Sequence, residues 1–430
     1  MGRRSSNPTF SAFAHREFRY LVASNATYFL GLMGQMVLRS ILAWNLTHSP
    51  LALSYVSLAL GVPMLLLAPL GGVIVDRYER RGLIIKAQSL ILVGEGMVLA
   101  LLIAGTLQFW QLLLTTVVTG SAFTVISPAR HAIVVQVVPR ADLNNALALA
   151  AASLNLAKVL GPAAMGVLVP WLGMVASYSV SLTVYTIGLL TMLGVARHPI
   201  VTARHASPWA GLRDGLAYLR GHTAIRQLFF LGFVPAFFGL PFQYLLIVYA
   251  EEVWAVGTRG FGFLQAAAGL GAVLGTVIVA RQSAHSSTHR TLVVSLLGFG
   301  LCLGAFALSP LFPLGLVLVL LSMLAANVFV TRNTIAVQLL TSDAMRGRMS
   351  SIIFMTISLT PLGTMPLAWL AESLGPQWAL VLSAGAMLVV GAALFAFSPG
   401  LRHLDAALAG ASAPAAVNAA AVAADERALP

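Results

Sequence analysis

The sequence predicts an all-α membrane protein with twelve transmembrane helices in two six-helix bundles. The 430 residues are 59% hydrophobic and only 9% charged, with a mean hydropathy of +0.89, whereas soluble chains contain about 25% charged residues. Twelve apolar runs are long enough to cross a bilayer, the two halves resemble each other, and the alternating pattern of a β-barrel is absent. This composition excludes a soluble enzyme and a disordered polymer.

The individual spans follow from length, because a helix needs about 20 apolar residues to cross the hydrocarbon layer. Runs of this kind lie at 20–46, 51–75, 83–105, 109–138, 143–170, 173–196, 225–250, 257–280, 290–310, 312–335, 349–374 and 376–398. Several contain Gly or Pro, which bundled membrane helices tolerate. We expect the first span to be an uncleaved helix, since no small-residue cleavage site follows it.

The basic residues predict the orientation of these spans. The chain has 25 Lys and Arg against 13 Asp and Glu, a net charge of +12. Of the 25 basic residues, 22 lie at the termini or in the gaps after even-numbered spans. Because cytoplasmic loops are enriched in Lys and Arg, we expect both termini in the cytoplasm, with the protein in a bacterial inner membrane. The basic excess therefore reflects topology and predicts no nucleic-acid partner.

The longest polar interruption divides the chain into two halves. We expect an N-terminal bundle over 1–196, a cytoplasmic linker over 197–224, a C-terminal bundle over 225–400 and a disordered Ala-rich tail over 401–430. Within the linker, Ser207 and Pro208 predict the start of an amphipathic helix on the cytoplasmic leaflet.

The halves are similar at a nearly constant offset. Residues 129–136 align with residues 331–338, pairing Arg130 with Arg332, and Gly161 pairs with Gly363 at the same offset of 202. Parallel repeats of this kind place a binding site near the midplane, between two bundles that rock against each other.

Residues 72–81 carry the pattern G-x-x-x-D-R-x-x-R-R, which resembles the signature of the major facilitator superfamily. Residues 127–130 and the pairing of Gly161-Pro162 with Gly166 are similar to its enterobactin-exporter-like and drug-efflux branch. The resemblance covers about 15–400 and implies a twelve-helix transporter. Ala280 replaces the acidic residue in the second copy of the signature, which is a departure from the pattern.

The signature implies a gate on the cytoplasmic side. Its candidate residues are Gly72, Asp76, Arg77, Arg80, Arg81 and Arg130. We expect Asp76 to face an arginine or the N-terminus of span eleven, where helix dipoles favour an acid. The alternative is that these arginines only fix the orientation of the chain.

Three charges fall inside predicted spans, namely Arg39, Glu95 and Lys158. Such charges are costly in a membrane and therefore mark coupling or substrate sites by default. Glu95 is the candidate proton acceptor. The alternative is that it forms a static pair with Arg39 or Lys158, while Lys158 could instead bind an anionic group or snorkel.

Uncharged polar residues in spans one, seven and ten are candidates for lining the cavity. They are Gln35, Gln243, Tyr244 and Asn327. Interhelical hydrogen bonding is the alternative role for each. Span seven is also rich in phenylalanine, which suits an amphipathic or aromatic substrate, although phenylalanines can equally face lipid. Within the span-five motif of Gly161, Pro162 and Gly166, we expect Gly161 and Pro162 to break the helix near its outer half.

The sequence contains no motif that would support an enzyme. No P-loop, H-E-x-x-H or G-x-S-x-G pattern occurs, and neither the histidines nor Cys302 has metal-ligand spacing. We therefore expect a monomeric secondary transporter without metal or cofactor. It would export a small amphipathic molecule, such as a drug or a siderophore, in exchange for protons. Uptake, lysolipid flipping, and a non-transporting receptor or assembly factor remain the alternatives.

Overall fold

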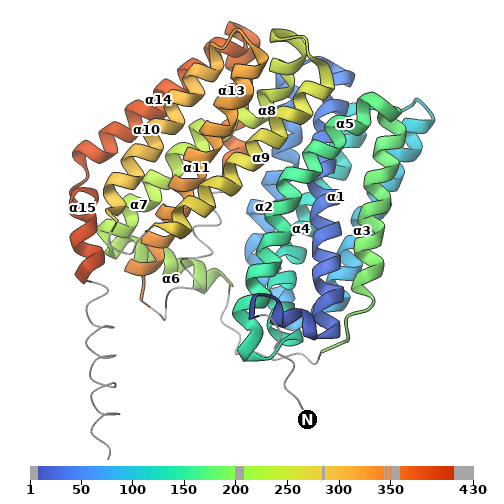
Figure 1. Cartoon of the computed structure of the whole chain (residues 1–430), viewed down its shortest axis with the longest axis horizontal. Coiled ribbons are helices and arrows are strands. Elements are labelled where there is room, and N and C mark those ends of the chain that lie inside the picture. The colour runs from blue at the N-terminus through green and yellow to red at the C-terminus, as the bar shows by residue number, and fades with distance from the viewer. Residues whose placement is uncertain are drawn as a thin grey trace, which may run out of the picture.

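The computed structural model describes residues 8–198, 208–282, 286–342, 345, 349 and 359–410. Every regular element in these ranges is a helix (Figure 1). Ten of the described helices are long and apolar enough to cross a membrane. The predicted all-α membrane protein is therefore confirmed, and the count in the described ranges is ten.

The N-terminal helices form one group. They are η1 (Pro8–Ala14), α1 (Arg16–Thr47), α2 (Pro50–Arg77), α3 (Arg80–Ile103), α4 (Phe109–Val137), η2 (Arg140–Asp142) and α5 (Leu143–Met192). The main contacts of α1 are with α5, and α2 and α3 both pack on α4. Helix α5 covers two predicted spans, 143–170 and 173–196.

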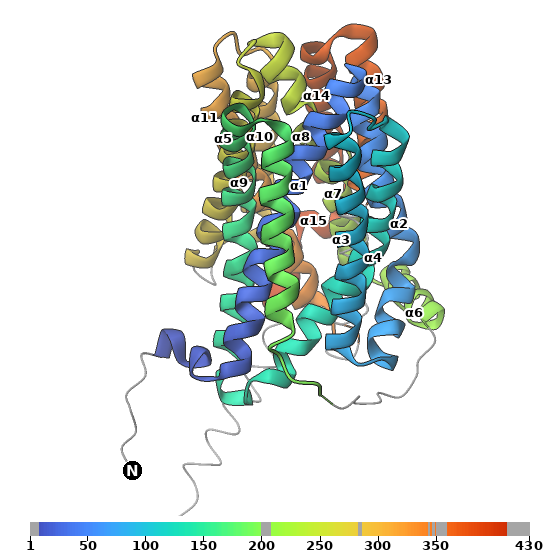
Figure 2. The same ribbon diagram turned by 90° about the vertical axis from the view of Figure 1, so that its right-hand side faces the viewer.

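The C-terminal helices form the second group. They are α7 (Thr223–Val234), η3 (Pro235–Gly239), α8 (Phe242–Val248), η4 (Tyr249–Val253), α9 (Gly257–Arg281), α10 (Thr288–Ala307), α11 (Phe312–Leu340), α13 (Thr360–Leu374), α14 (Pro376–Phe397) and α15 (Pro399–Arg402). Between the groups, α6 (Pro208–Gly221) begins at the predicted proline and contacts α2 and α7 (Figure 2). Most of the predicted span 349–374 before Thr360 lies outside the described residues.

The break in α5 lies away from the predicted position. The helix continues through Pro162 and Pro170, and its non-helical backbone occurs at Gly173, with φ 79° and ψ 172°. This left-handed conformation favours glycine because it has no Cβ. The prediction that Pro162 breaks span five is therefore wrong, since a membrane helix can absorb a proline whereas the turn needs the conformational freedom of Gly173.

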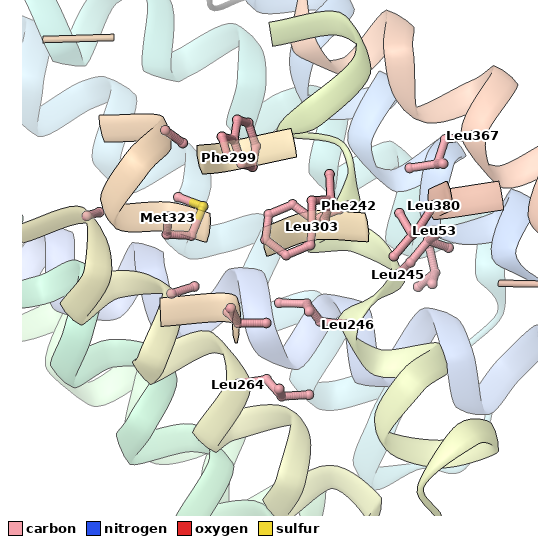
Figure 3. Close-up of a cluster of buried hydrophobic side chains, with 14 of the residues drawn as sticks. Leu53, Phe242, Leu245, Leu246, Leu264, Phe299, Leu303, Met323, Leu367 and Leu380 are labelled. Carbon is pink, nitrogen blue, oxygen red and sulfur yellow. The ribbon is translucent and has the colours of Figure 1, made fainter. Parts of the chain in front are cut away.

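We call the end of the molecule at which α1 begins the proximal end, and the opposite end the distal end. The two groups lie close together at the distal end and diverge towards the proximal end (Figure 1). One buried apolar cluster joins them: Leu53 of α2 packs among Leu245, Leu367 and Leu380 of the C-terminal group (Figure 3). Two further clusters, nearer the proximal end, contain N-terminal residues alone.

The C-terminal segment differs from the predicted tail. Residues 404–410 are helical, and the side chains of Leu401 and Leu404 are fully buried. Most of the first ten residues of the predicted disordered tail are thus helical instead, because these two leucines have a core to pack on. Residues 411–430 lie outside the described residues.

Candidate functional site

A charged cluster lies inside the N-terminal group. The carboxylate of Glu95, only 2% exposed, pairs with the guanidinium of Arg39, and the hydroxyl of Tyr178 donates to its second oxygen. The same Arg39 nitrogen donates to the hydroxyl of Thr119 at 2.7 Å. The carboxylate of Glu95 on α3 is therefore linked directly to α1 and α5, and through Arg39 to α4.

This arrangement gives Glu95 two charge-dependent partners. Hydrogen bonds to an ionised acceptor are stronger than neutral ones, so the cluster stabilises the carboxylate in an apolar surrounding. Protonation of Glu95 would remove the ion pair and leave Arg39 with Thr119. The expected pairing of Glu95 with Arg39 is present, whereas titration during transport stays a prediction.

Sequence reasoning missed Tyr178 and Thr119. Uncharged hydroxyl groups are common in membrane spans, so neither residue stood out from its neighbours. A usable signal exists for the tyrosine: Tyr178 and Tyr185 lie seven residues apart, which places them on one face of α5, and both are buried.

Arg130, which the sequence analysis assigned to the gate, has a buried side chain, unlike the exposed Asp76 and Arg77. Its side chain, 3% exposed, lies inside the N-terminal group near the proximal end. It donates to Ser24 at 3.2 Å, to Asn25 at 2.5 Å and to Gln88 at 2.9 Å, and its guanidinium lies 4.2 Å from the centre of the Tyr28 ring. Arg130 therefore joins α4 to α1 and α3.

The other gate candidates lie around the connection between α2 and α3. Gly72, Asp76 and Arg77 are exposed, and Asp76 has no hydrogen-bond or ionic partner among the residues that the structure describes. The Arg80 guanidinium donates to the carbonyl of Ala132 at 3.3 Å, and that of Arg81 to the carbonyl of Leu193 at 2.9 Å. Residues 350–358, at the expected partner helix of Asp76, lie outside the described residues.

Glu79, inside the signature but unassigned by sequence, caps α3. Its carboxylate accepts from the backbone N–H groups of Arg81 at 3.0 Å and Gly82 at 2.7 Å. An acid at this position satisfies otherwise unpaired N–H groups. Part of the signature therefore serves to start α3.

The span-five residues lie where helices approach closely. A Cβ on Gly161 would lie 2.8 Å from the Met33 Cβ of α1, and one on Gly166 would lie 2.2 Å from the Gly262 Cα of α9. Pro162 is buried between them. Gly166 therefore permits direct backbone contact between the two groups of helices.

Lys158 lies on the same contact between α5 and α9. Its backbone carbonyl faces Gly269, where a Cβ would lie 2.4 Å away. The side chain is half-buried, and no carboxylate in the described ranges lies within ion-pair distance of its ammonium. The alternative in which Glu95 pairs with Lys158 is not observed.

A small cavity of about 30 Å³ lies between α7 and α11. Apolar side chains form most of its wall, including Phe229 and Phe329, while Asn333 and Thr334 supply the polar groups. The side-chain oxygen of Asn333 is buried and has no hydrogen-bond partner in the described part of the chain. Helices of the predicted spans seven and ten therefore enclose this cavity.

The four predicted cavity residues are not part of this wall. Gln35 is buried on α1, and its amide has no partner among the described residues. Gln243 and Tyr244 are half-buried on α8. Asn327 donates to the Met323 carbonyl of its own helix at 3.4 Å. This hydrogen bond lies within α11, so it is neither the predicted contact with a cavity nor the interhelical alternative.

A comparison with protein families matches residues 7–427 to the transmembrane secretion effector family of the major facilitator superfamily. The chain belongs to this family. The members of this family are membrane transporters and not enzymes. The predicted superfamily and the prediction of a non-enzyme are therefore both confirmed.

Curated relatives extend over almost the whole chain. The enterobactin exporter of Escherichia coli is 25% identical over 93% of this chain and 94% of its own length. The staphyloferrin A transporter of Staphylococcus aureus is 22% identical over 83% of this chain and 90% of its own length. Among solved structures, a peptide transporter aligns with a TM-score of 0.73 at 15% identity, covering 93% of this chain and 99% of its own, which supports the fold.

Proposed function

We propose that this family member is a proton-coupled exporter of small amphipathic molecules of the siderophore type, working by alternating access. Membership of a secretion effector family supports export, and the relatives named above act on siderophores according to their names. The observation that carries the coupling mechanism is the buried cluster of Glu95, Arg39 and Tyr178.

Glu95 would act as the proton carrier. In the ionised form it holds Arg39 and Tyr178, which ties α3 to α1 and α5. Protonation would cancel the ion pair. A buried arginine without its counter-ion is unfavourable by about 3–5 kcal/mol. That energy would favour a rearrangement of α1 against its neighbours, which links proton binding to conformation.

The substrate would bind between the two groups of helices. The C-terminal group would supply aromatic and apolar contacts from the wall of the small cavity between α7 and α11, which would have to open well beyond its about 30 Å³ to take the apolar part of a substrate. Lys158, on the contact of α5 with α9, offers a cation for an acidic part. An amphipathic molecule with an anionic group would satisfy both.

We further propose twelve spans, with both termini in the cytoplasm of a bacterium and the protein acting as a monomer in the inner membrane. Two features support the number twelve: Gly173 divides α5 into two segments, and α13 is a described helix of 15 residues in the predicted eleventh span. No metal or cofactor is required, since the proton gradient would supply the energy, about 2.3 kcal/mol per charge per 100 mV.

The test uses purified protein in proteoliposomes. A thermal-shift screen against siderophores, drugs and lipids first identifies a substrate, and its flux is then measured with and without a pH gradient. We expect Glu95→Gln to abolish the flux driven by the gradient while retaining exchange of substrate across the membrane.

Glu252→Gln is the matched control, because Glu252 is exposed at the distal end. A Glu95→Gln protein that is as responsive to the pH gradient as the wild type would contradict the role of Glu95. Absence of gradient-dependent flux with every substrate of the panel would favour a non-transporting role for the whole protein.

A further inference from the structure

A polar contact joins the two groups of helices at the distal end. The carboxylate of Glu372, in the last turn of α13, accepts a hydrogen bond from the hydroxyl of Ser49. It accepts another from the backbone N–H of Leu51, at 3.3 Å. Ser49 is the N-cap of α2 and Leu51 lies in its first turn. Glu372 therefore binds the N-terminus of a helix in the opposite group.

This contact replaces a cap that α2 does not provide for itself. The Ser49 side chain accepts no capping hydrogen bond from its own helix, and its hydroxyl donates to Glu372. The first N–H groups of any helix lack intrahelical acceptors, and the helix dipole favours an acid beside them. The N–H of Leu51 at the N-terminus of α2 thus has its acceptor on α13.

Packing along α2 also differs between its two ends. At Gly61, in the half nearer Ser49, a Cβ would lie 2.1 Å from the Pro361 ring at the start of α13. At Gly72, near the proximal end, a Cβ would meet no atom of the described residues within 4 Å. Helix α2 therefore contacts α13 in its distal part, and the exposed Asp76 at its other end is unpaired with any described residue.

We propose that Glu372 is a positioning residue for transport, which holds the distal end closed by capping α2 across the two groups. The role rests on the alternating access proposed above, because release of α2 opens the distal end. Loss of a helix cap changes an equilibrium by about 2- to 30-fold. Removing the Glu372 carboxylate should raise the ratio of distally open to closed protein by a factor in this range.

The experiment measures that ratio directly. Spin labels are attached at Thr106 and Leu308, which are exposed at the distal end after α3 and α10, in a Cys302→Ser background. Pulsed electron paramagnetic resonance in lipid nanodiscs then gives the distance distribution. We expect Glu372→Ala to populate a longer distance and Glu372→Gln, which keeps an acceptor oxygen, to have a smaller effect.

Glu252→Ala is the matched control, since it removes an exposed distal glutamate that makes no hydrogen bond or ion pair with the described residues. Ser49→Ala tests the same contact from the other helix, and serves if Glu372→Ala fails to fold. It should shift the distances between the spin labels in the same direction as Glu372→Ala. The variant that carries both substitutions should shift them only slightly further than Glu372→Ala alone.

The proposal would be overturned if Glu372→Ala and Ser49→Ala both gave the same distance distribution as the wild type. The measurement needs no substrate and no proton gradient. A negative transport assay would therefore count against the proposed function alone, and an unchanged distance distribution against Glu372 alone.

Discussion

Arg130 is a buried cation whose partners are all neutral. Its guanidinium bonds with the side chains of Ser24, Asn25 and Gln88 and lies over the ring of Tyr28. No carboxylate of the described residues lies within ion-pair distance of the Arg130 guanidinium. Several dipoles and one aromatic face thus compensate the charge, and the fork geometry of arginine is needed to reach them together.

We predict that Arg130→Lys destabilises the N-terminal group. A lysine ammonium is a single point charge and cannot span Asn25 and Gln88 as the guanidinium does, so at least one hydrogen bond to a charged group is lost, at about 1.5–3 kcal/mol. Thermal unfolding of purified protein in detergent should show a clearly lower midpoint. Arg77→Lys, at an exposed position, should leave it unchanged, and equal midpoints for both variants would contradict the assigned role.

At the scale of the element, helix starts are often capped by residues far away in the chain. The carboxylate of Asp405 accepts from the Ser287 hydroxyl at 2.5 Å and from the N–H groups of Thr288 at 2.8 Å and His289 at 3.2 Å. These groups form the start of α10. The segment after α15 is therefore held to the C-terminal group by its contact with α10.

The same contacts affect the protonation of Asp405. Partial burial raises the pKa of its carboxyl, but the hydrogen bonds from Ser287, His289 and Thr288 outweigh burial and lower the pKa below the ordinary 3.8. A lowered pKa in the folded state means that the carboxylate stabilises the fold above the ordinary value. This stabilisation is lost as the pH falls from about 3.8 through the folded value.

We predict that Asp405→Ala accelerates amide hydrogen exchange in the first turn of α10 by about fivefold, the equivalent of a cap worth about 1 kcal/mol. Asp405→Asn is the matched variant, because an amide oxygen also caps helices. It should retain most of the protection and lose the dependence on pH. Identical exchange in the wild type and Asp405→Ala would show that the cap contributes nothing.

At the scale of the whole molecule, one acid lies at each end of α2. Its distal N-terminus is bound by Glu372 of α13, whereas Asp76 at its proximal end is exposed. Rocking of the two groups would exchange these contacts, because α2 is too rigid to dock on α13 at both ends when the groups diverge. The state described here has the distal contact formed.

We predict that Asp76→Asn leaves the amount of inserted protein unchanged and lowers transport by about 2- to 30-fold, the range expected from about 0.3–2 kcal/mol for an acid at a helix terminus. It should favour the distally closed state, opposite to Glu372→Ala. Transport rate per folded molecule in proteoliposomes is the measurement. Wild-type transport by a well-expressed Asp76→Asn protein would contradict a proximal gate at this residue.

Periodicity, length and charge identified much of this architecture. The apolar runs located the long helices, Pro208 marked the start of α6, and the short list of buried charges contained Arg39 and Glu95. They could not place the break in α5, which depends on the backbone of Gly173. They also could not show that the side chain of Arg130 is buried, because a basic residue near the end of an apolar run looks the same whether it turns outward or inward.

The sequence by itself determined the membrane class and the superfamily, since both depend on local features: run length, composition and one contiguous signature. Tertiary structure alone decided which partner each charge takes. Tyr178 reaches Glu95 across 83 residues and Glu372 reaches Ser49 across 323. Contacts at such separations depend on the relative positions of packed helices, which no window of the sequence contains, and these contacts carry the proposed coupling and gating.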